Sequence, residues 1–217
     1  MLSEQETRLN EILRRIAESL DISPTDYERA VQSYGAVGTW LEDGFEDDAY
    51  PGSSAKPDIY PQGSIRFGTV VKPLSACDDA AYDVDLVIEL QYVNIAWSPK
   101  NAETVKQMVG TRLNKNGIYS GKLKKEGKRC WTIEYAKDNG IGFHIDVLPC
   151  VPDLTSGKQI TQANPGNPNT REELTKTTIA ITNRDDNRNP SYSWCSSNPQ
   201  GYAEWFKEQN KSNCSQG

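Results

Sequence analysis

Two acidic residues separated by one position, Asp83 and Asp85, are the strongest chemical signal in the sequence. They open the apolar run 83–90, which is typical of a strand, and residues two apart in a strand share one face. Carboxylates held side by side repel each other, and a cation between them removes that cost. Hard oxygen ligands suit Mg²⁺ or Mn²⁺. The spacing therefore predicts a metal site at this strand.

A second strand pattern, at 141–151, carries His144 and Asp146 on its polar face. If the two strands are neighbours, Asp146 joins the first pair of carboxylates. Three carboxylates of this kind can hold two ions about 3.5–4 Å apart. We expect His144 to make a structural hydrogen bond, or one to a metal-binding residue, rather than to bind metal itself. The candidate catalytic and metal-binding residues are thus Asp83, Asp85 and Asp146.

A candidate phosphate-binding turn lies upstream, at Gly63 and Ser64. A glycine lets backbone N–H groups approach an anion closely, and a serine hydroxyl adds a donor. Taken alone, none of these signals requires a functional site, because acidic pairs arise by chance and Gly-Ser is usually a simple turn. Their combination in this order is far more specific.

The positions of these residues require a sheet with helices around it. Helical spacing of apolar residues predicts helices at 4–20 and from Pro24 to about Leu41, then from Pro99 to about 116. We expect a strand or tight turn at 62–71, a hairpin at 122–137, mostly irregular structure at 152–200, and a helix from about 200. Helices followed by interleaved strands predict an α+β fold with a mixed central sheet flanked by helices.

The amino-acid composition indicates which ligands and which cellular compartment to expect. The 217 residues carry a net charge of −6, which argues against a polynucleotide ligand but not against a small phosphorylated one. Five cysteines with no C-x-x-C pair favour free thiols in a reducing cytoplasm. Because no apolar run approaches the ~20 residues of a membrane span, we expect a cytoplasmic protein with no membrane contact.

Four segments together resemble the DNA-polymerase-β-like nucleotidyltransferase superfamily and, within it, the bacterial cGAS/DncV-like nucleotidyltransferases. They are QGSIRFGTVVKPL at 62–74, YDVDLV at 82–87, FHIDVLP at 143–149 and SNPQGYAEWF at 197–206. The resemblance implies an enzyme that joins nucleoside triphosphates into cyclic di- or oligonucleotide messengers in anti-phage defence. It implies two Mg²⁺ or Mn²⁺ ions on Asp83, Asp85 and Asp146, the last also helping to activate the acceptor hydroxyl. Gly63 and Ser64 would hold the triphosphate.

The family's enzymes have a second, mostly helical lobe. We expect residues 1–206 to form the catalytic lobe and residues 207–217 to be the start of a helical lobe that is largely missing. The resemblance thus allows a separately encoded helical lobe or a regulatory protein as partner.

Several alternatives remain. A glycosyltransferase that binds metal through an acidic pair is one alternative. It is disfavoured because the apolar run usually precedes the pair in those enzymes, whereas here the run follows it. A calcium loop beginning at Asp83 fails because Ile88 and Asn94 occupy its required glycine and glutamate positions. A tRNA- or poly(A)-directed nucleotidyltransferase shares the site chemistry, and a non-catalytic nucleotide- or partner-binding module is the main rival of another class.

Two further groups of residues are expected to have structural rather than functional roles. The basic cluster is expected to be a solvated surface, and the large aromatic residues are expected in the core rather than as base-stacking platforms. The cluster comprises Lys122, Lys124, Lys125, Lys128 and Arg129, and the aromatic residues are Trp131, Trp194, Trp205 and Phe206.

Overall fold

The computed structural model describes residues 3–45, 56–72, 81–91, 97–136, 142–185 and 190–214. In chain order the elements are α1 (Glu4–Leu20), α2 (Pro24–Glu42), β1 (Asp58–Gln62), α3 (Gly63–Phe67), β2 (Ala81–Glu89), α4 (Pro99–Asn114), α5 (Gly117–Ser120), β3 (Trp131–Tyr135), β4 (Gly142–Pro152), α6 (Leu154–Ala163), the 3₁₀ turn η1 (Pro168–Thr170), α7 (Glu172–Thr175), β5 (Ile179–Asp185), β6 (Ser191–Ser197) and α8 (Pro199–Cys214).

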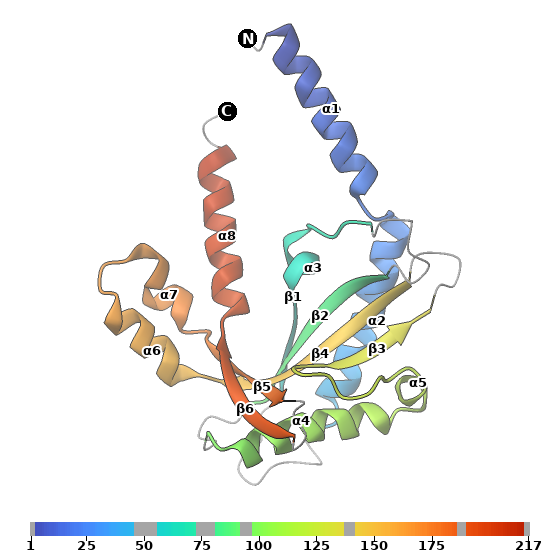
Figure 1. Ribbon diagram of the computed structural model, residues 1–217, viewed down its shortest axis with the longest axis vertical. Helices are drawn as coiled ribbons and strands as arrows, with labels where there is room; N and C mark the ends of the chain where they lie inside the picture. Colours follow the sequence, from blue (N-terminus) through green and yellow to red (C-terminus); the bar gives the residue numbers. More distant parts are fainter. Residues whose placement is uncertain are drawn as a thin grey trace.

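One mixed sheet organises the chain, as the sequence predicts (Figure 1). Its strands follow the order β1-β2-β4-β5-β6, and β3 also pairs with β4. β2 and β4 run parallel, whereas the other pairs are antiparallel. A parallel pair needs a crossover connection, and the chain between β2 and β4 supplies one that includes α4. The α+β class with a mixed sheet flanked by helices is confirmed.

The core lies between one face of the sheet and helices α2 and α4. Val84, Leu86 and Ile88 on β2 are essentially inaccessible, and they belong to the same cluster as Leu41 of α2 and Val109 of α4. The alternation expected for 83–90 is therefore confirmed, because every second residue of β2 is removed from solvent on this face. The two helices are also tied together by the Trp40 indole, which donates to the Arg112 carbonyl at 3.1 Å.

The other face of the sheet has an apolar part and an acidic part. Toward one end it carries a small apolar cluster that includes Val87, Leu148 and Ile181. Toward the start of β2 the same face carries Asp83 and Asp85, of which the first is exposed and the second partly buried. The apolar part anchors the strands and leaves the acidic part accessible.

Serine residues cap the starts of α2 and α4, which begin at the expected prolines. The Ser23 and Ser98 hydroxyls accept the backbone N–H groups of Asp26 and Asn101, and each serine is followed by a proline in the first turn. Both caps satisfy donors that the first turn leaves without helical partners.

Three expectations about local structure were wrong in whole or in part. Residues 152–200 hold α6, α7, β5 and β6 rather than mostly irregular chain. Residues 63–67 form a short helix after β1, where a strand or tight turn was expected. The hairpin at 122–137 is reduced to β3 and one isolated bridge between Leu123 and Ile133. Short elements of this kind carry too few residues to show a period in the sequence.

Two helices project from the same side of the sheet, at the two ends of the chain (Figure 1). α1 has no buried residue, and its apolar side chains at Leu9, Leu13 and Ile16 are about half exposed. α8 projects beside it and continues through residue 206, so the boundary expected there stays a prediction. Of the helices described, none combines the length and the apolar character needed to cross a membrane.

Candidate active site

Two of the three candidate carboxylates face each other directly across neighbouring strands. In the parallel pair of β2 and β4, Asp85 stands in register with Asp146, and Asp83 stands in register with His144. Because side chains alternate along both strands, Asp83, Asp85 and Asp146 emerge on the same face of the sheet. The structure thus brings together the residues that the sequence proposed, while their role as metal ligands stays a prediction.

The environment of Asp85 disfavours its negative charge. Partial burial is the main cause, and the nearby carboxylates of Asp146 and Asp83 add to it, so that the pKa of Asp85 rises to about 6. A bound cation would oppose both effects. This is the electrostatic signature expected of carboxylates arranged to share a metal ion.

The other two carboxylates already have partners. The Thr132 hydroxyl on β3 donates to Asp146 Oδ1 at 2.6 Å. His144 Nδ1 lies 3.4 Å from Asp83 Oδ1, and His144 Nε2 lies 3.5 Å from Glu134 Oε1. His144 therefore makes the polar contacts expected of a structural residue.

The donor set fits a hard divalent cation in residue type, charge and strand position. As the side chains lie, however, no three His, Cys, Asp or Glu residues in the described part of the chain form a group that could hold a metal ion. In this arrangement Asp83 contacts His144, and Asp146 accepts a hydrogen bond from Thr132.

Gly63 is fixed against Asp85. Its φ of +65° lies in the left-handed region, and a Cβ at this position would lie 2.5 Å from Asp85 Oδ2. The register of β1 with β2, which pairs Gln62 with Asp85, creates this approach. Only glycine meets both conditions without strain. Ser64 follows in α3, which ends at Gly68 in the left-handed conformation, and its phosphate-binding role stays a prediction.

A cavity of about 790 Å³ opens beside Gly63 and Asp85. Its opposite wall comes from the part of the chain that was expected to be irregular, through Asn169 and Leu174, and from α8, through Tyr202 and Trp205. The volume lies within the range of sites for small molecules and cofactors. No sequence pattern marks residues 169–174 as part of a site, because their place in the wall depends on long-range packing.

Aromatic rings line the α8 side of this cavity. Tyr202 meets Phe67 of α3 edge to face at 5.4 Å between ring centroids, and the Tyr202 and Trp205 rings lie 5.5 Å apart. Tyr202 is 53% exposed. The expectation that Trp205 is a core residue was wrong, because it lines the cavity, whereas Trp131 and Trp194 do pack against the core.

The basic cluster is a surface segment, as expected. Lys125, Lys128 and Arg129 are exposed. Lys124 forms an ion pair with Glu134, and Lys122 lies over the Tyr135 ring at 4.2 Å. These contacts are typical of a solvated face.

Comparison with known families agrees with this arrangement. Residues 57–149 match the family described as the nucleotidyltransferase domain of DncV-like cyclic GMP-AMP synthases. The matched range includes Gly63, Ser64, Asp83, Asp85 and Asp146. Over residues 57–149 the chain is therefore similar to a DncV-like nucleotidyltransferase domain. The fold class and the enzyme class expected from the sequence are those of this family.

Two relatives of the DncV-like domain show the extent of the likeness. A c-di-GMP synthase from Roseivirga ehrenbergii is 31% identical over 204 residues, which make up 94% of this chain and 44% of that protein. The crystal structure of the Vibrio cholerae DncV cyclic AMP-GMP synthase, described as a prokaryotic cGAS homolog, superposes with a TM-score of 0.54 at 13% identity. That match covers 88% of this chain and 58% of the other. The chain thus spans about half the length of these relatives.

Proposed function

We propose that this chain is the catalytic lobe of a nucleotidyltransferase that joins nucleoside triphosphates into cyclic di- or oligonucleotides. One observation carries the proposal: Asp85 faces Asp146 across the parallel strands, lies where it leaves no room for a side chain at Gly63, and borders a cavity of about 790 Å³. Phosphoryl transfer depends mainly on positioning and charge neutralisation. This corner of the fold offers both.

Asp83, Asp85 and Asp146 are the residues that would hold two Mg²⁺ or Mn²⁺ ions. Bound there, the ions would supply charge neutralisation for the triphosphate and activation of the attacking hydroxyl. The raised pKa of Asp85 supports this assignment, since the repulsion that raises it is relieved by positive charge.

Residues around the carboxylates would bind the other parts of the nucleotide. Gly63 and Ser64 hold the triphosphate in our proposal, and the aromatic wall at Tyr202 and Trp205 borders the space for a base. The acceptor hydroxyl oxygen forms a new ester bond to the α-phosphorus while the bond to pyrophosphate breaks. Asp146 helps to activate that hydroxyl, whose proton passes to a carboxylate of the site.

The substrate class follows from the relatives. Because the 31% identical relative is a c-di-GMP synthase, GTP is the first substrate to test and a cyclic dinucleotide is the first product to seek. The anti-phage role and the cytoplasmic location are proposed on the family resemblance alone. A polynucleotide acceptor, as in tRNA- or poly(A)-directed enzymes, is disfavoured by the net charge of −6.

We also propose that a helical lobe, on the same or another polypeptide, completes the substrate cleft. The chain spans 44% of the c-di-GMP synthase. Tyr202 on the cavity wall is largely exposed, and α1 has no buried residue. Surfaces of this kind suit a second lobe.

The rival proposal is a non-catalytic module that binds nucleotide or a partner protein. It is favoured by the side-chain positions, since the described residues form no three-ligand group as they lie. Labelled GTP and ATP with Mg²⁺, incubated with the longest native form of the protein and with its Asp85→Asn variant, decide between the two. We expect metal-dependent cyclic product only from the unaltered protein, and nucleotide binding without turnover in both proteins would support the module.

A further inference from the structure

Helix α8 forms one wall of the cavity but is scarcely attached to the core. Among its described side chains, at 199–211, only Gly201 is buried. Figure 1 shows the helix leaving the body of the molecule beyond this point. The rings of Tyr202 and Phe206 meet Phe67 of α3, at 5.4 Å and 4.9 Å between centroids. Polar contacts on another side of the helix add to these in fixing the position of Tyr202 and Trp205 over the cavity.

Most of these polar contacts come from one segment, residues 167–175, which we name the bracket. At the base of α8, the Asn198 amide donates to the Leu174 carbonyl, and the Gly201 N–H donates to Asn198 Oδ1 at 2.8 Å. Gly201 lies so close to the Leu174 carbonyl that a side chain has no room there. The start of α8 is therefore packed directly against α7.

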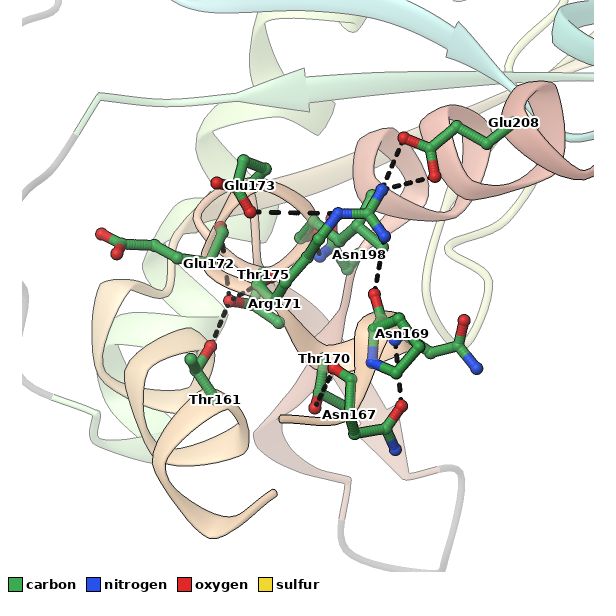
Figure 2. A network of polar contacts seen from close by, with 12 residues as sticks. Thr161, Asn167, Asn169, Thr170, Arg171, Glu172, Glu173, Thr175, Asn198 and Glu208 are labelled. Carbon is green, nitrogen blue, oxygen red and sulfur yellow. Dashed lines mark hydrogen bonds and ion pairs between the residues drawn. The ribbon is translucent and has the colours of Figure 1, made fainter. Parts of the chain in front are cut away.

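Two further ties lie higher on the same face of the helix. The Trp205 indole donates to Asn169 Oδ1 at 2.9 Å. The Arg171 guanidinium donates to both carboxylate oxygens of Glu208 (Figure 2). Positions 198, 201, 205 and 208 are three or four residues apart, so they share one side of the helix. The bracket thus holds α8 at three levels along about two turns.

The bracket is itself held in shape by local bonds. The Asn169 N–H donates to Asn167 Oδ1 at 3.0 Å, and Arg171 Nη1 donates to the Pro168 carbonyl at 2.6 Å. The Thr161 and Thr175 hydroxyls, 2.7 Å apart, tie α6 to α7. Figure 2 shows these bonds surrounding Arg171. A planar guanidinium that engages a carboxylate with two bonds fixes direction as well as distance, which a lysine does not.

We propose that Arg171 and Asn169 are positioning residues that set the aromatic wall of the nucleotide cavity. Arg171 fixes the direction of α8 through Glu208, and Asn169 fixes the indole of Trp205. Both act through other groups rather than on the reacting atoms. The inference rests on the proposed function for its nucleotide part, whereas the orientation of Trp205 can be measured without any nucleotide.

The test uses ¹⁹F resonances of protein labelled with 5-fluorotryptophan. The chain has five tryptophans, and Trp205→Phe identifies the signal of interest. Arg171→Gln and Asn169→Leu should each shift or broaden the Trp205 signal in ligand-free protein. Asn169→Asp keeps an acceptor oxygen, so its Trp205 signal should match that of the unaltered protein. The charge-swapped double variant Arg171→Glu with Glu208→Arg should likewise give the unaltered signal. Arg14→Gln, which breaks the exposed ion pair with Glu18 on α1, is the matched control.

The second readout is the affinity for GTP in the presence of Mg²⁺, measured by calorimetry. We expect Arg171→Gln and Asn169→Leu to weaken binding by roughly three- to tenfold, the range for exposed charged or polar bonds, with Arg14→Gln unchanged. An unmoved Trp205 signal in both variants overturns the bracket. If the Trp205 signal moves but the GTP affinity is unaltered, the bracket has no role in nucleotide binding at the cavity. An unaltered chain that binds no GTP counts against the proposed function, while the Trp205 signal still decides the structural part.

Discussion

Gly63 and Asp85 are in such close approach that a Cβ on the glycine would lie 2.5 Å from Asp85 Oδ2. The glycine also has a positive φ of 65°. The pairing of β1 with β2 enforces both features. The turn that is proposed to hold phosphate and the carboxylate that is proposed to hold metal are therefore one rigid unit.

Replacing Gly63 with alanine should displace Asp85. Gly68→Ala is the matched control, because Gly68 has a φ of 67° but no atom of the described residues lies within 4 Å of its Cβ position. Both changes place alanine in the left-handed region, which costs about 1 kcal/mol. Only Gly63→Ala should in addition weaken Mn²⁺ binding, measured by calorimetry. Equal Mn²⁺ affinity in the two variants would count against the contact having a role.

The metal-free chain should lose stability as the pH rises through about 6. The pKa of Asp85 is raised from 3.8 to about 6 by burial and then by Asp146 and Asp83. A carboxyl whose pKa is raised by folding contributes stability that is fully present below its unfolded pKa and lost as the pH rises through its folded pKa. The loss should be about 1–2 kcal/mol, since the side chain is partly exposed.

Asp85→Asn isolates this effect. In chelator-treated protein, the thermal midpoint of the variant relative to the unaltered chain should rise between pH 4.5 and pH 7.5. Adding Mn²⁺ at pH 7.5 should stabilise the unaltered chain more than the variant. A difference between the two proteins that does not change with pH contradicts the assignment.

Much of this corner of the fold follows from local pattern. The period of two in 83–90 places Asp83 and Asp85 on one face, and the same holds for His144 and Asp146 at 141–151. The register that sets Asp85 against Asp146 does not follow, since a parallel pair is joined by a long crossover and its alignment depends on packing.

The cavity wall could not be predicted for a related reason. Its residues Asn169, Leu174 and Thr175 lie in helices of three or four residues, which show no hydrophobic period. Their contacts with α8 join positions far apart in the chain, as Arg171 with Glu208 and Asn169 with Trp205 demonstrate. A polar, proline-containing stretch such as 164–172 therefore resembles an irregular loop until α8 is placed against it.

Thr132 should prove to be a positioning residue for Asp146. Its hydroxyl donates to Asp146 Oδ1 at 2.6 Å from the adjacent strand, in direct register. Thr132→Val keeps the shape and removes the donor, so we expect an altered Mn²⁺ affinity, whereas Thr132→Ser should restore it. The measurement is Mn²⁺ titration by electron paramagnetic resonance. If the valine and serine variants match the unaltered chain, the hydrogen bond has no role in metal binding.

Residues 1–217 alone should make little or no cyclic product. The proposed anchors hold the phosphates, but alignment of a second nucleotide needs walls on both sides of the cleft, and such orientation is worth roughly 7–11 kcal/mol of barrier. A helical lobe, supplied on a longer native chain or as a separate protein, should restore synthesis. Chromatography of labelled products measures this. Efficient synthesis by the 217-residue chain without any partner would contradict the proposal.

The central claim is that Asp83, Asp85 and Asp146 bind divalent metal together with a nucleotide at the Gly63 turn. Electron paramagnetic resonance of Mn²⁺, titrated with a non-hydrolysable GTP analogue, tests it most directly because it requires no turnover. The account predicts two Mn²⁺ ions for each unaltered chain once the analogue is bound, and a marked loss of both metal and nucleotide in Asp85→Asn. Nucleotide binding that is equally strong without Mn²⁺ and in Asp85→Asn would contradict it.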